Sequence, residues 1–179
     1  HVGVFAGHSA GSLRDTEGFS VPRDGYQIGG LIGYDHRIAG IPGVVLGGEI
    51  DLAVLDVSGS STIDGFVVQG SSKVLATARA RLGYSFGNSM LYATGGLAST
   101  NGTIKGTDGL VAVEASQTHI KGWTYGAGLE SYLFGNAGVR LEWLHFDWRP
   151  SGFTSDTLDT GKIKLTDDTI RAALIFRLN

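Results

Sequence analysis

The chain has 179 residues, no cysteine, and a formal net charge of −3 from 14 basic and 17 acidic side chains. Without a basic block it lacks the face that nucleic-acid binding requires, and without cysteine it can form neither a disulfide nor a thiolate metal site. Charged residues are only 17% of the chain, glycine is abundant at 29 residues and proline is scarce at 3, which suits one domain, residues 1–179, made of many strands and turns.

The main signal along the chain is an alternation of apolar and polar residues with a period of two. In Thr169–Asn179, for example, one face is wholly apolar while the other carries Arg171 and Arg177. Successive side chains of a strand point to opposite faces, so this pattern predicts strands. In chain order the segments are Val2–Ser9, Tyr26–Tyr34, Val44–Asp56, Lys73–Phe86, Met90–Ala98, Ile120–Ser131, Val139–Trp148 and Thr169–Asn179.

The connections between these segments alternate in length. Long loops are expected at Ala10–Gly25, Val57–Ser72, Ser99–His119 and Arg149–Asp168, and shorter ones at Asp35–Gly43, Gly87–Ser89 and Gly135–Ala137. A meander around a barrel produces this alternation, with the long loops at one rim and the short turns and both termini at the other. The sequence therefore predicts an all-β fold, an eight-stranded antiparallel up-and-down barrel.

A soluble barrel of the lipocalin type and a membrane barrel share this pattern but turn opposite faces inward. The polar face is rich in arginine and almost free of lysine, which favours confined ion pairs over a solvated surface. We therefore expect a transmembrane barrel with a polar interior and an interior charge network. Its members are Glu49, Asp51, Arg79, Arg81, Glu130, Arg140, Glu142, Arg171 and Arg177.

Aromatic residues gather towards the ends of the predicted strands, as in the two aromatic belts of membrane barrels. One group, near the short turns, is Tyr34, Tyr84, Phe86 and Phe176. The other, towards the long loops, is Tyr26, Trp123, Tyr125, Trp143 and Trp148. This sorting predicts an outer-membrane location with lipid and lipopolysaccharide as neighbours.

The segments 122–130 (GWTYGAGLE) and 139–143 (VRLEW) resemble the sixth and seventh strands of the alphaproteobacterial outer-membrane immunogenic proteins. These are porin-like, opacity-type small barrels related in architecture to the OmpA membrane domain. Segments 79–84 (RARLGY) and 91–98 (LYATGGLA) are similar to the fourth and fifth strands of the same family. The resemblance implies a cell-envelope protein and surface antigen of a Gram-negative bacterium, with roles in envelope integrity, host contact and, in some members, haem binding or peptidoglycan attachment.

Two features concern the ends of the chain. His1 is a poor start residue, so we expect a processed or partial chain. Such barrels commonly finish on an aromatic residue, whereas this sequence finishes Phe176-Arg177-Leu178-Asn179.

Several motifs suggest chemistry but have simpler interpretations. Gly7–Gly11 matches the G-x-S-x-G nucleophile elbow, which needs a following helix that the pattern does not predict. His8 with Ser9, or His145 with Asp147, are the candidates for an envelope-lipid esterase or deacylase. Four histidines lack the spacing of a metal site, and each is either a haem ligand or an ordinary polar residue at the barrel rim. Two acidic pairs either bind a divalent ion or are ordinary acids exposed to solvent. These are His8, His36, His119 and His145, and Asp167 with Asp168 and Asp156 with Asp159.

The function favoured by the sequence is that of an integral outer-membrane surface protein with a structural role and loop-mediated interactions, because an eight-stranded barrel is filled by its own side chains and is not an open pore. We expect that the protein is not an enzyme and that it has no catalytic, cofactor or metal site. The alternatives are a haem-type ligand-binding barrel and a lipid-modifying one. The candidate partners are peptidoglycan and other envelope proteins. The outer wall is rich in alanine and glycine, which predicts lateral association with further copies of the chain. We expect both termini in the periplasm and the long loops outside the cell.

Overall fold

The computed structural model describes residues 1–14, 20–63, 66–107, 112–149 and 164–178. Its elements are β1 (Val2–Arg14), β2 (Ser20–Arg37), β3 (Val44–Ile63), β4 (Phe66–Phe86), β5 (Ser89–Thr107), β6 (Ala112–Phe134), β7 (Ala137–Arg149) and β8 (Lys164–Phe176). Within this part of the chain, no helix is long and apolar enough to cross a membrane.

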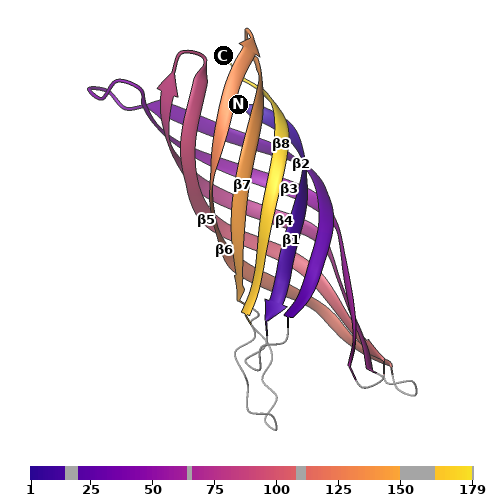
Figure 1. Cartoon of the computed structure of the whole chain (residues 1–179). Coiled ribbons are helices and arrows are strands. Elements are labelled where there is room, and N and C mark those ends of the chain that lie inside the picture. The colour runs from indigo at the N-terminus through magenta and orange to yellow at the C-terminus, as the bar shows by residue number, and fades with distance from the viewer. Residues whose placement is uncertain (15–19, 64–65, 108–111, 150–163, 179) are drawn as a thin grey trace.

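The strands form a closed barrel in sequence order, and every neighbouring pair is antiparallel (Figure 1). Closure is made by β8 on β1, which stay in register from Val2↔Phe176 to Arg14↔Lys164. Both termini lie at the rim formed by the short turns, and the long hairpins extend from the other rim (Figure 1). The sequence-based prediction of an eight-stranded up-and-down barrel is confirmed.

Two of the short turns contain a glycine whose backbone conformation favours that residue. Gly87 and Gly135 have φ of +57° and +59°, a region that glycine reaches without a Cβ penalty. Each is followed by asparagine in a two-residue turn, and the flanking strands pair directly at Phe86↔Ser89 and Phe134↔Ala137. These primed turns match the twist of the strands they join.

The long-loop predictions were wrong in extent, because three of the segments are mostly strand. Pairing continues to Arg14↔Ser20, to Ile63↔Phe66 and to Thr107↔Ala112. Alternation fades in these extensions because they are rich in glycine, serine and threonine, while backbone hydrogen bonding continues without it. The fourth predicted loop falls largely on residues 150–163, which lie outside the described part of the chain.

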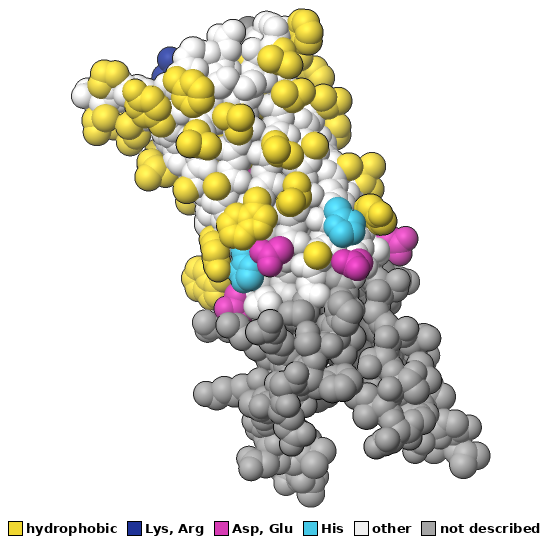
Figure 2. All heavy atoms as spheres, in the orientation of Figure 1, with side chains coloured by type: hydrophobic (Ala, Val, Ile, Leu, Met, Phe, Trp, Pro, Cys, Tyr) yellow, Lys and Arg dark blue, Asp and Glu magenta, His cyan; other side chains and the backbone are white. Residues whose placement is uncertain are grey.

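The apolar and polar faces of the strands are reversed relative to a soluble barrel, with apolar side chains outside and charged ones inside. On β8, Leu174 is 55% exposed and its neighbour Ile175 is fully buried, while Arg171 is 2% exposed. The outer wall carries apolar side chains over most of the described surface, and histidine and acidic side chains gather near the hairpin end (Figure 2). The wall is therefore suited to lipid and the interior holds the charge.

Candidate functional site: the charged interior and its two ends

Glu49 on β3 lies at the centre of the ion-pair network inside the barrel. One of its carboxylate oxygens accepts from Arg79, and the other accepts from Arg140 at 2.6 Å and from Arg81 at 3.2 Å. All four side chains are almost completely removed from solvent. A single carboxylate thus joins two groups of charges, one on each side of it along the barrel axis.

The group on the hairpin side is built around Glu142 on β7. Its two oxygens accept from Arg79 at 3.0 Å and from Arg171 at 2.5 Å. Asp51 on β3 accepts from the same two arginines, at 2.8 and 3.0 Å. Tyr92 on β5 donates its hydroxyl to Glu142 at 2.6 Å. Five strands therefore meet in this group across the barrel cross-section.

The group on the short-turn side is built around Glu130 on β6. Its Oε2 accepts from Arg81 at 3.0 Å and from Arg140 at 2.8 Å. The guanidinium of Arg81 also lies 4.1 Å from the ring centroid of Tyr92, within cation–π range. His1 completes this group, with Nε2 3.0 Å from Glu49.

Eight of the nine predicted network residues thus come together, and Arg177 does not. Arg177 follows the end of β8 and is exposed at the short-turn rim, where its guanidinium lies 3.9 Å from the ring centroid of Tyr132. Its parity places it on the inward side, but the strand has ended before it could reach a carboxylate of the network. Sequence reasoning also omitted His1 and Tyr92 from the network, although Tyr92 alternates with its outward-facing neighbours Leu91 and Ala93.

Glycine makes room for the large interior groups. A Cβ on Gly128 would lie 2.3 Å from the Tyr92 hydroxyl, and one on Gly33 would lie 2.6 Å from the His1 ring. Both distances are below any real contact, so only glycine at these positions leaves the space that Tyr92 and His1 occupy. The high glycine content of the chain is in part a packing requirement of the network.

An apolar layer fills the interior on the hairpin side of the charges. Phe146 and Trp148 stack with ring centroids 5.4 Å apart, and Trp148 donates its indole N–H to Asp167 at 2.6 Å. The layer is continued by Ala53, Leu75 and Leu144, and the same cluster of buried apolar side chains runs alongside the charges towards the short turns through Phe5, Leu31, Ala173 and Ile175. Trp148 is 6% exposed and therefore does not belong to the predicted aromatic belt. Its position five residues after the outward-facing Trp143 gives it the opposite parity.

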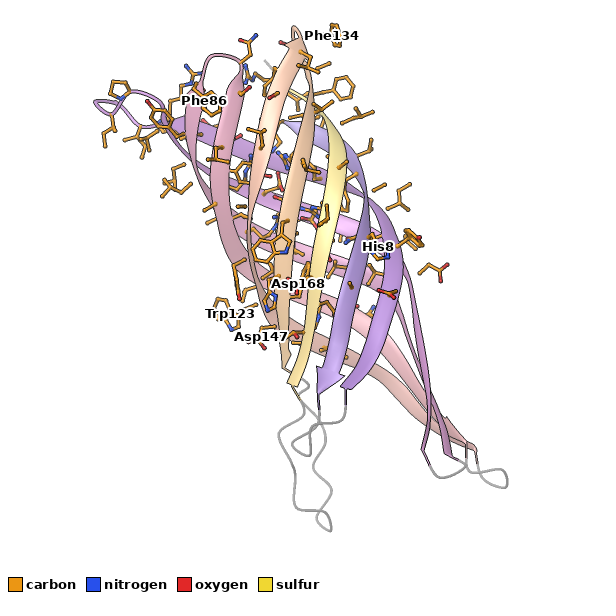
Figure 3. All side chains as sticks on the ribbon, viewed as in Figure 1. His8, Phe86, Trp123, Phe134, Asp147 and Asp168 are labelled. Atoms are coloured by element: carbon orange, nitrogen blue, oxygen red, sulfur yellow. The ribbon has the colours of Figure 1, made fainter. Side chains whose placement is uncertain are left out.

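The other predicted belt residues are exposed on the outer wall. They are Tyr26, Tyr34, Tyr84, Phe86, Trp123, Tyr125, Trp143 and Phe176. Figure 3 shows Phe86 near the short-turn rim and Trp123 towards the hairpin end, close to Asp147 and Asp168. The ring of His145 packs 5.0 Å from that of Tyr125, and its Nδ1 lies 2.9 Å from an oxygen of Asp168.

The candidate catalytic pairs are not assembled. His8 is exposed on the outer wall, whereas Ser9 faces inward and shares a hydrogen bond of 2.8 Å with Thr169. Gly7–Gly11 lies within β1, with no turn to a helix. The acid that pairs with His145 is Asp168 and not Asp147.

The candidate metal residues are also separated. Asp167 bonds inward to Trp148 while Asp168 points outward to His145, so these adjacent acids do not share one site. No group of three ligating side chains is found among the described residues. The side chain of His119 and the pair Asp156 and Asp159 lie outside the described part of the chain.

A cavity of about 680 Å³ opens at the short-turn rim. His1, Asp35 and Arg37 line one side, Glu130 and Tyr132 reach it from β6, and Arg177 lies at its edge. Burial lowers the pKa of His1, but hydrogen bonds to Asp35 and Glu49 raise it by more, so that the pKa lies above its ordinary value. We call this cavity the mouth cavity.

Comparison with known proteins matches this architecture. Residues 2–170 match the family described as outer membrane protein beta-barrel domain. The chain is 32% identical over 143 residues to the 22 kDa outer membrane protein of Rhizobium leguminosarum bv. viciae, an overlap that includes 78% of this chain and 61% of that protein. The chain thus spans about three fifths of the length of this relative.

Among solved structures, the fold is similar to that of Ail, the attachment invasion locus protein of Yersinia pestis. The structure of Ail in complex with the heparin analogue sucrose octasulfate has a TM-score of 0.53 and 13% identity, over 98% of this chain and 97% of that chain. A second Ail structure has a TM-score of 0.51 and 12% identity over the same shares. At these identities the similarity concerns the fold alone. On its family match and its fold, the chain belongs to the outer membrane protein β-barrel domain family.

Proposed function

We propose that this protein is a closed, non-conducting barrel of the outer membrane, which acts through its lipid-facing wall and its long hairpins. The observation that carries the proposal is the network joined by Glu49, which reaches from β3 to β4, β6, β7 and β8. The apolar layer around Phe146 and Trp148 adds a second obstruction. An ion crossing the barrel would have to break several buried charge-assisted contacts and then enter a dry layer.

Planar-bilayer recording tests the closed interior. The purified barrel is expected to give no stable open channel, while a general porin in the same bilayers serves as the positive control. A change in gel mobility on heating proves that each inserted sample is folded. A stable pore of nanosiemens scale from the folded sample would contradict the proposal.

The proposal also gives the barrel an orientation, with the short turns and termini in the periplasm and the hairpins outside the cell. Support comes from the unequal rims, because outer-membrane barrels have short periplasmic turns and longer outer loops. The chain has no cysteine, so single substitutions report position cleanly. Asn101→Cys near the hairpin end is expected to react with an impermeant maleimide on intact cells, and Asn88→Cys in a short turn only after permeabilisation. The reverse pattern would overturn the orientation.

We further infer that the barrel is not an enzyme. In the described part of the chain, the hydroxyl of Ser9 bonds to Thr169 inside the barrel, away from the outward-facing His8. The His145–Asp168 pair lies against the rings of Tyr125 and Trp143, and no serine or threonine of the described residues bonds to it. Mass spectrometry of lipid A incubated with the folded barrel is expected to show unchanged acyl chains, and any loss of an acyl chain would refute the inference.

A further inference from the structure

The mouth cavity ends on the buried ion-pair network, two members of which, His1 and Glu130, belong to its lining. Glu130 forms part of its floor, and the Oε2 of that carboxylate is already held by Arg81 and Arg140 at 3.0 and 2.8 Å. The other acid that lines the cavity, Asp35, lies 3.1 Å from Nδ1 of His1 and 3.7 Å from Arg81. Both carboxylates of the cavity therefore have cationic partners.

Two cations of the cavity have no such partner. Arg37 at the end of β2 and Arg177 after β8 form no ion pair with any residue that the structure describes. Arg177 is instead held against the face of Tyr132, with its guanidinium 3.9 Å from the ring centroid. The cavity therefore carries an excess of positive charge at its edge.

The placement of these arginines is set by the barrel. β1 lies between β8 and β2 and pairs with both, so Arg177 and Arg37 lie on either side of the start of β1, where His1 lines the cavity. Ser85 and Asn88, from the end of β4 and the turn after it, also line the cavity and offer hydroxyl and amide groups. This is a concave polar site with two guanidinium groups and several neutral hydrogen-bonding groups.

We propose that the mouth cavity binds a small organic anion that carries carboxylate or phosphate groups. A guanidinium presents a planar set of donors that matches either group with two parallel hydrogen bonds. The cavity of about 680 Å³ is large enough for a small metabolite. Because the site lies at the short-turn rim, the ligand comes from the periplasm in the orientation proposed above.

Calorimetric titration of the barrel in nanodiscs at low salt tests the site, since both rims are open to solvent there. Citrate provides the carboxylate probe, glycerol phosphate the phosphate probe, and glycerol the neutral counterpart. We expect saturable binding of at least one anion and none of glycerol, with affinity that falls as salt is added. The stronger of the two anions identifies the acid group that the site prefers.

Substitutions then locate the binding. Arg177→Gln and Arg37→Gln are each expected to weaken the anion about tenfold, the loss of a charge-assisted hydrogen bond. Arg177→Lys keeps the charge without the planar pair of donors and is expected to weaken it less. Lys121→Gln, on the outer wall at the hairpin end, is the matched control and should leave the affinity unchanged.

Heat-dependent gel mobility shows that each variant is folded before titration. Absence of binding by both anions, binding of glycerol as tightly as glycerol phosphate, or equal affinities in the two arginine variants and the wild type would each overturn the proposal. The last result would indicate that the arginines serve the lipid headgroups of the rim instead.

Discussion

Arg79 is the residue on which most of the buried acids depend. It contacts Glu49, Asp51 and Glu142, all without access to solvent. Removing one partner of a buried ion pair leaves the other charge without compensation, which costs more than the pair itself contributes. The three acids would then share the remaining guanidiniums.

We predict that Arg79→Ala lowers the free energy of unfolding by about 3–5 kcal/mol, the usual cost of breaking a buried pair. Urea unfolding in detergent micelles, followed by tryptophan fluorescence, measures it. Arg37→Ala, at an exposed arginine with no ion pair among the described residues, is the control and should change stability by less than about 0.5 kcal/mol. Equal effects of the two substitutions would show that the network does not stabilise the barrel.

Gly128 and Gly30 give a matched pair for the packing argument. A Cβ on Gly128 would lie 2.3 Å from the Tyr92 hydroxyl, while one on Gly30 would meet nothing closer than a backbone oxygen at 3.7 Å. Gly128→Ala is expected to displace Tyr92 from Glu142 and to destabilise the barrel by about 1–3 kcal/mol, as overpacking does. Gly30→Ala should be nearly neutral in the same unfolding experiment, and a neutral Gly128→Ala would contradict the tight fit.

At this scale, strand parity predicted most of the network from the sequence. Parity needs only a correct strand, and Glu49 to Arg171 all lie in strands with clear alternation. The aromatic belts rest on distance from the strand ends, which does not separate the two faces of a strand, so the inward-facing Trp148 was predicted on the wall and Tyr92 was missed. Distances between strands far apart in sequence, such as Asp51 to Arg171, depend on barrel closure and could not be derived from any one segment.

At the scale of the elements, the hairpin extensions carry structure that the sequence did not reveal. Register shifts occur at Val54/Val57 between β3 and β4, at Ser72/Val74 between β4 and β5, and at Gly102/Ile104 between β5 and β6. A bulge of this kind bends a strand and increases its twist. All three lie near the polar boundary of the wall, and beyond them the hairpins leave the barrel (Figure 1).

Hydrogen exchange in micelles distinguishes paired extensions from loops. Amides of residues 57–63 and 66–72 are expected to exchange more slowly than unpaired amides, because their strands pair up to Ile63↔Phe66. Amides of 50–54, within the apolar band, should be the slowest and serve as the internal reference. Exchange of 57–63 at the rate of an unstructured peptide would restore the long loop that the sequence predicted.

At the scale of the whole molecule, the inversion of apolar and charged faces predicts how the protein behaves when it is handled. The exposed wall residues, such as Leu174 and Ile50, need detergent or lipid, and the closed sheet leaves no strand edge unpaired. The unboiled protein is therefore expected to migrate differently from the boiled one on a denaturing gel and to partition into detergent. A sample that stays monomeric in buffer without detergent would contradict the membrane barrel.

The strand order and the alternation of faces follow from local sequence, so the overall architecture was predictable. The lengths of the strands beyond the apolar band were not, because segments rich in serine, glycine and threonine show no alternation of apolar and polar residues. The mouth cavity could not be predicted from the sequence either. It depends on where Arg37 and Arg177 lie at the rim and on how far the network reaches towards them.

The distribution of charge among the strands has a consequence for biogenesis. Asp51 and Glu142 belong to β3 and β7, but one of the two guanidiniums that neutralise them arrives only with Arg171 on the last strand. A nascent barrel that lacks β8 holds more acid than base in its lumen and exposes the lumen to water through an open seam. Docking of the final strand therefore closes the seam and supplies the missing guanidinium to the lumen in the same event.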